Sequence, residues 1–136
     1  MGTTLLLIRH GQSQANFERR FAGHWDVPLT DLGLQQARQT ADFVLNTYTV
    51  DAVYCSDLSR AAQTGIAVAE KANLPTILSQ NLREIYSRLW EGVLFSRLEQ
   101  DFSEDYARWR NDIGNSCPTE GESVAHLSQR IHQALR

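Results

Sequence analysis

Short runs of aliphatic residues alternate along the chain with longer segments in which apolar residues recur every three or four positions. The runs at residues 5–8, 50–56 and 74–79 are typical of buried strands. The longer segments, residues 30–47 and 58–72, have the period of amphipathic helices. Because strands that alternate with helices form parallel sheets through crossover connections, we predict an α/β domain of three layers, with a mostly parallel sheet flanked by helices.

The last third of the chain contains two further helical patterns separated by a loop. Large apolar and aromatic residues recur at helical spacing over residues 95–113, and we expect this stripe to face the core rather than to bind a ligand. Gly, Asn, Ser and Pro are frequent over residues 114–123, which indicates a loop. Residues 124–135 have the apolar spacing of a final amphipathic helix.

Length, charge and cysteine content limit the number of domains and the kinds of partner. The 136 residues, 42% of them hydrophobic, suit one domain over residues 1–136 rather than two. A net charge of −3 argues against nucleic acid or a membrane surface as partner, because both favour a basic face. No apolar run is long enough to cross a bilayer, no signal-peptide pattern is present, and there are only two cysteines. We therefore expect a cytoplasmic protein with reduced thiols.

Polar side chains follow the first two predicted strands where those strands end. Arg9, His10 and Gly11 come directly after residues 5–8, and Arg60 lies in the first turn of the helix that follows the second strand. Since ligands bind a parallel sheet beyond the carboxyl ends of its strands, we expect these side chains to converge on one crevice. Two guanidinium groups beside a helix N-terminus suit the oxygens of a phosphoryl group.

A histidine between two arginines is compatible with more than one role. His10 could act as a general base or as a nucleophile, and nearby cations would help to keep its imidazole neutral. The structural alternatives are a hydrogen-bonded structural histidine for His10 and a solvated helix arginine for Arg60. The spacing of the residues does not choose between these interpretations.

The sequence resembles the histidine phosphatase superfamily, also called the phosphoglycerate mutase-like family, in five motifs that occur in the family's order. The motifs are LLLIRHGQSQAN, FAGHWDVPLTDLGLQQA, VYCSDLSRAAQT, LREIYSRLWEG and PTEGES. A lone Arg-His-Gly sequence would be weak evidence, but five motifs in register over nearly all of the chain are a specific signal.

The resemblance implies a role for each matching residue. His10 would take the phosphoryl group as a phosphohistidine, and Glu84 would protonate the leaving oxygen and later activate water. The residues that would bind the phosphate oxygens are Arg9, Asn16, Gly23 and Arg60. No metal and no other cofactor is implied, and the expected partner is a small phosphorylated metabolite.

Two departures from the family pattern affect this interpretation. Arg88 stands where the family loop usually has glycine, so we expect a changed turn or an additional anion contact close to Glu84. The family also needs a second histidine on a later strand, whereas only His126 and His132 remain here, both in the helical pattern of residues 124–135. We expect neither to replace it, and we expect a C-terminally incomplete domain with impaired turnover.

The later strand of the family would pair near residues 5–8. Without it we expect an unpaired strand edge, which a domain-swapped or edge-paired homodimer could cover. The short interval between Gly92 and Pro118 favours a phosphomonoester hydrolase with a phosphohistidine intermediate over a glycolytic mutase. Phosphoglycerate mutase-type phosphoryl transfer and a non-catalytic phosphate-binding module remain alternatives.

Overall fold

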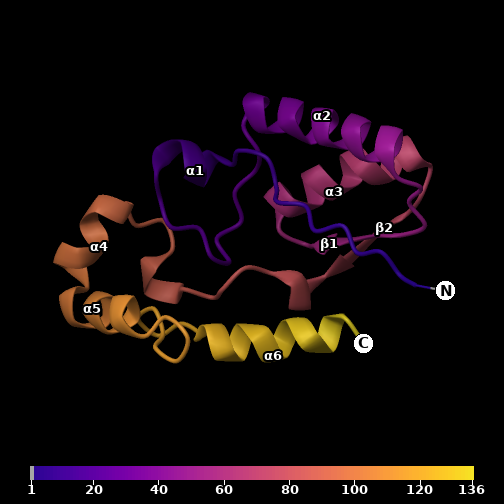
Figure 1. Ribbon diagram of the computed structural model, residues 1–136. Coiled ribbons are helices and arrows are strands. Elements are labelled where there is room, and N and C mark those ends of the chain that lie inside the picture. The colour runs from indigo at the N-terminus through magenta and orange to yellow at the C-terminus, as the bar shows by residue number, and fades with distance from the viewer. Residues whose placement is uncertain (1) are drawn as a thin grey trace.

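The computed structural model describes residues 2–136, and it arranges them as helices around a small parallel sheet (Figure 1). The elements in chain order are α1 (Gln14–Glu18), α2 (Asp31–Thr47), β1 (Val53–Ser56), α3 (Ser59–Ala72), β2 (Thr76–Ser79), the 3₁₀ helices η1 (Gln80–Leu82) and η2 (Arg88–Trp90), α4 (Phe95–Asp101), α5 (Ser103–Asn111) and α6 (Val124–Ala134). In Figure 1, α2 and α3 lie on one side of the strands and α6 lies on the other.

The two strands form a parallel pair joined by a helical crossover. Val53 of β1 lies opposite Thr76 of β2, and α3 connects the strands. The buried side chains of β1, α2 and α3 share one hydrophobic cluster. Gly65 of α3 approaches β1 so closely that a Cβ there would lie 2.9 Å from the Cys55 Sγ. The predicted α/β class with a parallel sheet is confirmed.

The first predicted strand, residues 5–8, does not form, and that prediction was wrong. Residues 2–12 have no regular secondary structure, and three of the four aliphatic side chains are exposed, with Leu7 at 87%. Leu6 alone of the four packs against the cluster of α2, β1 and α3. A strand needs a neighbour to satisfy its backbone hydrogen bonds, and the sheet formed by residues 2–136 consists of β1 and β2 alone.

Several large apolar side chains around the sheet are left uncovered. They are Leu5, Leu7, Ile8, Tyr54, Ile77 and Leu78. A homodimer that covers these side chains stays a prediction. Within residues 2–136, no helix combines the length and the apolar character that a membrane span requires.

A second hydrophobic cluster surrounds Trp90, which is fully buried in η2. The stripe predicted over residues 95–113 is divided between α4 and α5, and most of its aromatic side chains pack against this tryptophan. The Trp90 ring meets Phe21 and Trp109 edge to face, with centroids 5.8 and 5.5 Å apart, a favoured aromatic geometry. The expected core-facing role is confirmed for Leu98, Phe102, Tyr106 and Trp109, whereas Phe95 and Ile113 at the two ends of the stripe are exposed. The cluster holds one end of the loop that leads from β2 to α4.

The same loop contains Arg88, the residue that stands at the family's glycine position. Its φ of 34° lies in the left-handed region, where a side chain with a Cβ is strained. The guanidinium is exposed and pairs with Glu120 at 2.9 Å. The loop therefore keeps a backbone shape that favours glycine, and the anion that Arg88 contacts is a carboxylate of this chain.

Arg88 offers a test of that backbone strain. Left-handed backbone costs a residue with a Cβ about 1 kcal/mol that glycine does not pay. We predict that Arg88→Gly is more stable than Arg88→Ala by about 1 kcal/mol, the reverse of the usual order of these two residues. Both variants lose the Glu120 ion pair, so its contribution cancels. Chemical denaturation measures the two free energies of unfolding, and a more stable alanine variant would contradict the prediction.

Candidate functional site

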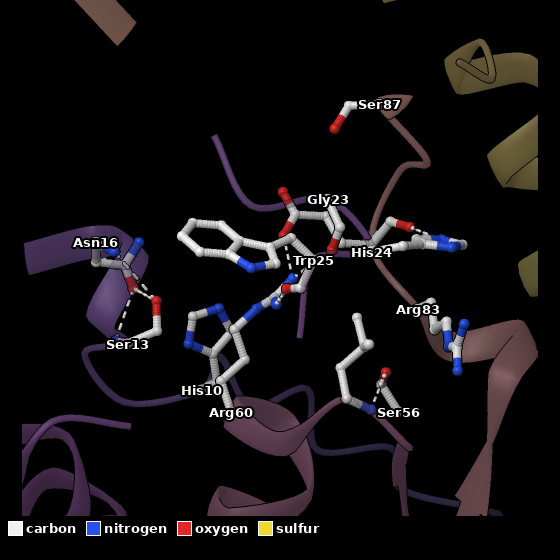
Figure 2. Close-up of polar contacts among 12 residues, drawn as sticks. His10, Ser13, Asn16, Gly23, His24, Trp25, Ser56, Arg60, Arg83 and Ser87 are labelled. Atoms are coloured by element: carbon white, nitrogen blue, oxygen red, sulfur yellow. Dashed lines mark hydrogen bonds and ion pairs between the residues drawn. The ribbon is translucent and has the colours of Figure 1, made fainter. Parts of the chain in front are cut away.

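The guanidinium of Arg60 lies at the centre of the site, where residues from three segments meet (Figure 2). Arg60 occupies the first turn of α3 and is 2% exposed. Its Nη1 donates to the Trp25 carbonyl at 3.1 Å, and its Nη2 donates to the Gly23 carbonyl at 2.7 Å and to Glu84 Oε2 at 2.9 Å. The alternative of a solvated helix arginine is thereby excluded, because a buried cation needs partners of this kind.

His10 is half-buried, and its hydrogen bonding selects one tautomer. The Nδ1 lies 2.6 Å from the Gly11 carbonyl oxygen. Because a carbonyl can only accept, Nδ1 carries the proton, and in the neutral ring the lone pair is on Nε2. Such a nitrogen is available as a nucleophile or as a base.

The surroundings of His10 lower its pKa below the usual 6.5. Burial of the ring is the main cause, since it disfavours the charged form. The hydrogen bond to Gly11 opposes this effect, the positive charge of Arg60 adds to it, and the carboxylate of Glu84 opposes it again. Arg9, which is exposed, makes the smallest contribution and also lowers the pKa. The balance favours the neutral imidazole.

The loop that carries His10 is held by close backbone packing rather than by a strand. The Gly11 N–H donates to Thr64 Oγ1 of α3 at 3.2 Å. A Cβ at Gly11 would overlap the Gly33 carbonyl in the first turn of α2, and a Cβ at Gly33 would overlap the Gln12 carbonyl. Two glycines thus let the loop lie directly against the start of α2, which gives the imidazole a fixed position.

Asn16 approaches the site from α1, a short helix that the sequence patterns did not predict. Its Oδ1 accepts hydrogen bonds from the Ser13 N–H at 3.0 Å and the Ser13 hydroxyl at 2.9 Å, which caps the helix. These bonds use only the amide oxygen of Asn16, so the N–H donors on Nδ2 take no part in capping the helix. In Figure 2, His10 is drawn between the Ser13–Asn16 pair and the Arg60 guanidinium.

Glu84 follows η1 and presents a half-exposed carboxylate to Arg60. Its backbone carbonyl accepts a hydrogen bond from His24 Nε2 at 2.9 Å. The His24 N–H in turn donates to Glu91 Oε1 at 2.8 Å, and its ring lies against Tyr86 with centroids 5.0 Å apart. The loop around Glu84 is therefore bonded to the segment that contributes Gly23 and Trp25.

Gly23 has a positive φ of 53°, and a Cβ there would overlap the Ser87 hydroxyl. The position therefore requires glycine. The carbonyl of Gly23 faces the Arg60 guanidinium, so its observed contact is with the arginine. A contact between Gly23 and phosphate stays a prediction.

One pair at the rim of the site was missed by sequence reasoning. Arg83 binds Asp57 with two hydrogen bonds, of 2.6 Å from Nε and 2.5 Å from Nη2, which lower the pKa of Asp57. Asp57 directly follows β1, the same kind of position that drew attention to His10. That position was a usable signal for Asp57, whereas nothing in the sequence marks Arg83 as its partner.

The two histidines near the end of the chain lie on α6 with exposed side chains. His132 Nδ1 donates to the Ser128 carbonyl at 2.8 Å, a bond within the same helix. The placement of both His126 and His132 on a helix follows the sequence pattern.

Comparison with known proteins connects the chain to characterised and probable enzymes. The family model described as histidine phosphatase superfamily (branch 1) matches residues 5–136. An adenosylcobalamin/alpha-ribazole phosphatase of Escherichia coli K12 is 37% identical over 131 residues, which are 96% of this chain and 64% of that protein. A probable phosphoglycerate mutase of Klebsiella pneumoniae is 37% identical over 133 residues, covering 95% of this chain and 60% of that protein. The chain thus spans less than two thirds of the length of these relatives.

Solved structures have the same fold over nearly the whole chain. A putative alpha-ribazole-5'-P phosphatase from Escherichia coli K-12 matches with a TM-score of 0.85 and 34% identity, over 94% of this chain and 63% of that one. A mycobacterial glucosyl-3-phosphoglycerate phosphatase complexed with VO3 matches with a TM-score of 0.85 and 28% identity, over 93% of this chain and 62% of that one. The chain therefore belongs to the histidine phosphatase superfamily, branch 1.

Proposed function

We propose that the chain contributes to phosphomonoester hydrolysis through a phosphohistidine formed on His10. The observation that carries the proposal is the hydrogen bond from His10 Nδ1 to the Gly11 carbonyl, which leaves the lone pair of the neutral ring on Nε2. A lowered pKa keeps the ring neutral, as attack on phosphorus requires. The relatives named as phosphatases support the same reaction class.

The proposed reaction has two steps. In the first, His10 Nε2 forms a bond to phosphorus, the bond from phosphorus to the ester oxygen breaks, and that oxygen takes a proton from the Glu84 carboxyl group. In the second, the water oxygen forms a bond to phosphorus, the bond from phosphorus to His10 Nε2 breaks, and the Glu84 carboxylate accepts a proton from the water. The products are an alcohol, inorganic phosphate and the original imidazole.

Positive charge for the transferring group would come from Arg60, with Arg9 and the Asn16 amide as further donors. Glu84 Oε2 accepts a hydrogen bond from the Arg60 Nη2 at 2.9 Å. A phosphate that binds there would therefore exchange places with this carboxylate. The negative charge of the phosphate would favour the protonated carboxyl group that the first step needs.

The proposed substrate is a small phosphomonoester. The short segment between Gly92 and Pro118 supports hydrolysis, whereas the probable phosphoglycerate mutase relative, also 37% identical, keeps mutase-type transfer as a second candidate. The chain spans less than two thirds of the length of these relatives. Phosphomonoester hydrolysis by the whole protein is therefore proposed together with the role of His10. We further propose that residues 1–136 act as one domain and that the protein is cytoplasmic.

A phosphoenzyme assay tests the proposal. We predict that incubation with a ³²P-labelled phosphomonoester gives an acid-labile, base-stable label, as expected for a phosphohistidine. His10→Asn should abolish the label, and the matched control His126→Asn, at an exposed position on α6, should keep it. Equal labelling of the His10→Asn variant would contradict the proposal. Label without phosphate release would indicate a half-built site, and phosphate binding without label would favour the non-catalytic binding module.

The pH dependence of His10 is a separate prediction. Because burial and the nearby guanidinium lower its pKa, the ring should become half protonated below pH 6.5 and be mostly neutral above that pH. The rate of phosphoenzyme formation should therefore persist as the pH falls to 6.5. NMR titration of the imidazole C–H signals measures the pKa directly, with His10→Asn to assign the signal. A titration midpoint above pH 6.5 would contradict the prediction that burial and the Arg60 charge lower the pKa of His10.

A further inference from the structure

One arginine outside the site binds the backbone of the loop that carries Glu84. Arg130 lies on α6 with a side chain only 19% exposed. Its Nη1 donates to the carbonyls of Asn81 at 2.9 Å and Arg83 at 2.8 Å, and its Nη2 donates to the carbonyl of Glu84 at 3.2 Å. With a longer bond from Nη1 to the Gln80 carbonyl at 3.5 Å, one guanidinium thus binds four carbonyls of the segment that carries Glu84, from a helix that lies outside the site.

The other side of Glu84 is held through the partner of Arg130. Glu122 forms an ion pair with the Arg130 guanidinium. The Glu122 Oε1 also accepts from the Tyr86 N–H at 2.8 Å, and the Glu122 N–H donates to the Tyr86 carbonyl at 2.8 Å. The ion pair of Arg130 and Glu122 therefore binds the loop both before and after Glu84.

The arrangement depends on the shape of the guanidinium group. Its planar fork presents five N–H donors, so it can bind several carbonyls and a carboxylate at once, whereas a lysine presents a single compact ammonium group. The position of the loop backbone thus depends on Arg130.

We propose that Arg130 is a positioning residue that holds Glu84 where its carboxyl group can protonate the leaving oxygen. In the structure the Glu84 carboxylate binds Arg60, and the Glu84 carbonyl accepts hydrogen bonds from Arg130 and from His24. Once a phosphate replaces the carboxylate on Arg60, the bonds to the backbone are the ones that still position Glu84. A displacement of about 1 Å in a catalytic group lowers rates by about 100-fold. The inference rests on the proposed function of Glu84 and adds a distant residue that the motifs do not assign to it.

Hydrogen exchange tests the positioning without any assay of activity. In Arg130→Ala, the Tyr86 amide and other exchangeable amides of residues 81–86 should exchange about 10-fold faster or more, while those of β1 and α3 keep their rates. Arg130→Lys should give a smaller increase. The matched control is Arg97→Ala, which removes an exposed ion pair with Asp101 on α4. Unchanged exchange over residues 81–86 in Arg130→Ala would overturn the proposal.

The dependence on the leaving group tests the catalytic consequence. An alkyl phosphate needs a proton on its leaving oxygen, whereas a nitrophenyl phosphate leaves well without one. In single-turnover mixing, Arg130→Ala should slow release of the alcohol from the alkyl phosphate by about 10- to 100-fold, because general acid catalysis contributes about 100-fold or more to such a step. Release of nitrophenol from the nitrophenyl phosphate, which needs no such catalysis, should slow by less than about 3-fold. Glu84→Gln should show the same selectivity, and Arg97→Ala should slow neither substrate.

The outcomes distinguish the proposed catalytic role of Glu84 from the proposed positioning role of Arg130. Equal slowing of both substrates by Arg130→Ala would show a merely structural role and would overturn the inference. If Glu84→Gln lacks selectivity, the proposed role of Glu84 fails, and with it the catalytic purpose of Arg130, although exchange still reports on the loop. If Arg130→Ala does not fold, Arg130→Lys supports the inference by selective slowing and overturns it by equal slowing.

Discussion

The burial of the Arg60 guanidinium is the constraint on which the rest of the site depends. A buried charge that loses its partners costs several kcal/mol, so the groups around it must stay in place. The partners of Arg60 come from the segment of Gly23 and Trp25 and from the loop of Glu84, while Arg60 itself belongs to α3. One side chain thereby ties together segments that no regular sheet connects.

The loop of Glu84 would otherwise be free to move, because it contains only short 3₁₀ turns between β2 and α4. Aromatic packing around Trp90 holds its far end, and hydrogen bonds from Arg130 hold its near end. The carboxylate between these two points therefore has a defined direction although it is half exposed. Apolar packing and backbone hydrogen bonding supply the order that secondary structure supplies elsewhere.

Features that depend on neighbours in the sequence were predictable, and features that depend on distant partners were not. The helix after Thr30 and the strand at Val53 follow from local spacing, and the positions of His10 and Arg60 follow from the ends of apolar runs. Residues 5–8 have the composition of a strand, but a strand also requires a pairing partner. In the same way, helical spacing cannot distinguish an arginine that binds carbonyls 46 to 50 residues away from a solvated one.

The contact between Gly11 and Gly33 also determines which parts of the site can adapt. The loop of His10 lies backbone to backbone against the start of α2, so it cannot open without separating from that helix. The rings of His24, Trp25 and Tyr86 at the rim stay partly accessible. Under the proposed function, the nucleophile would therefore belong to the rigid part of the molecule, and adjustment to the alcohol portion of the ester would fall to these aromatic side chains.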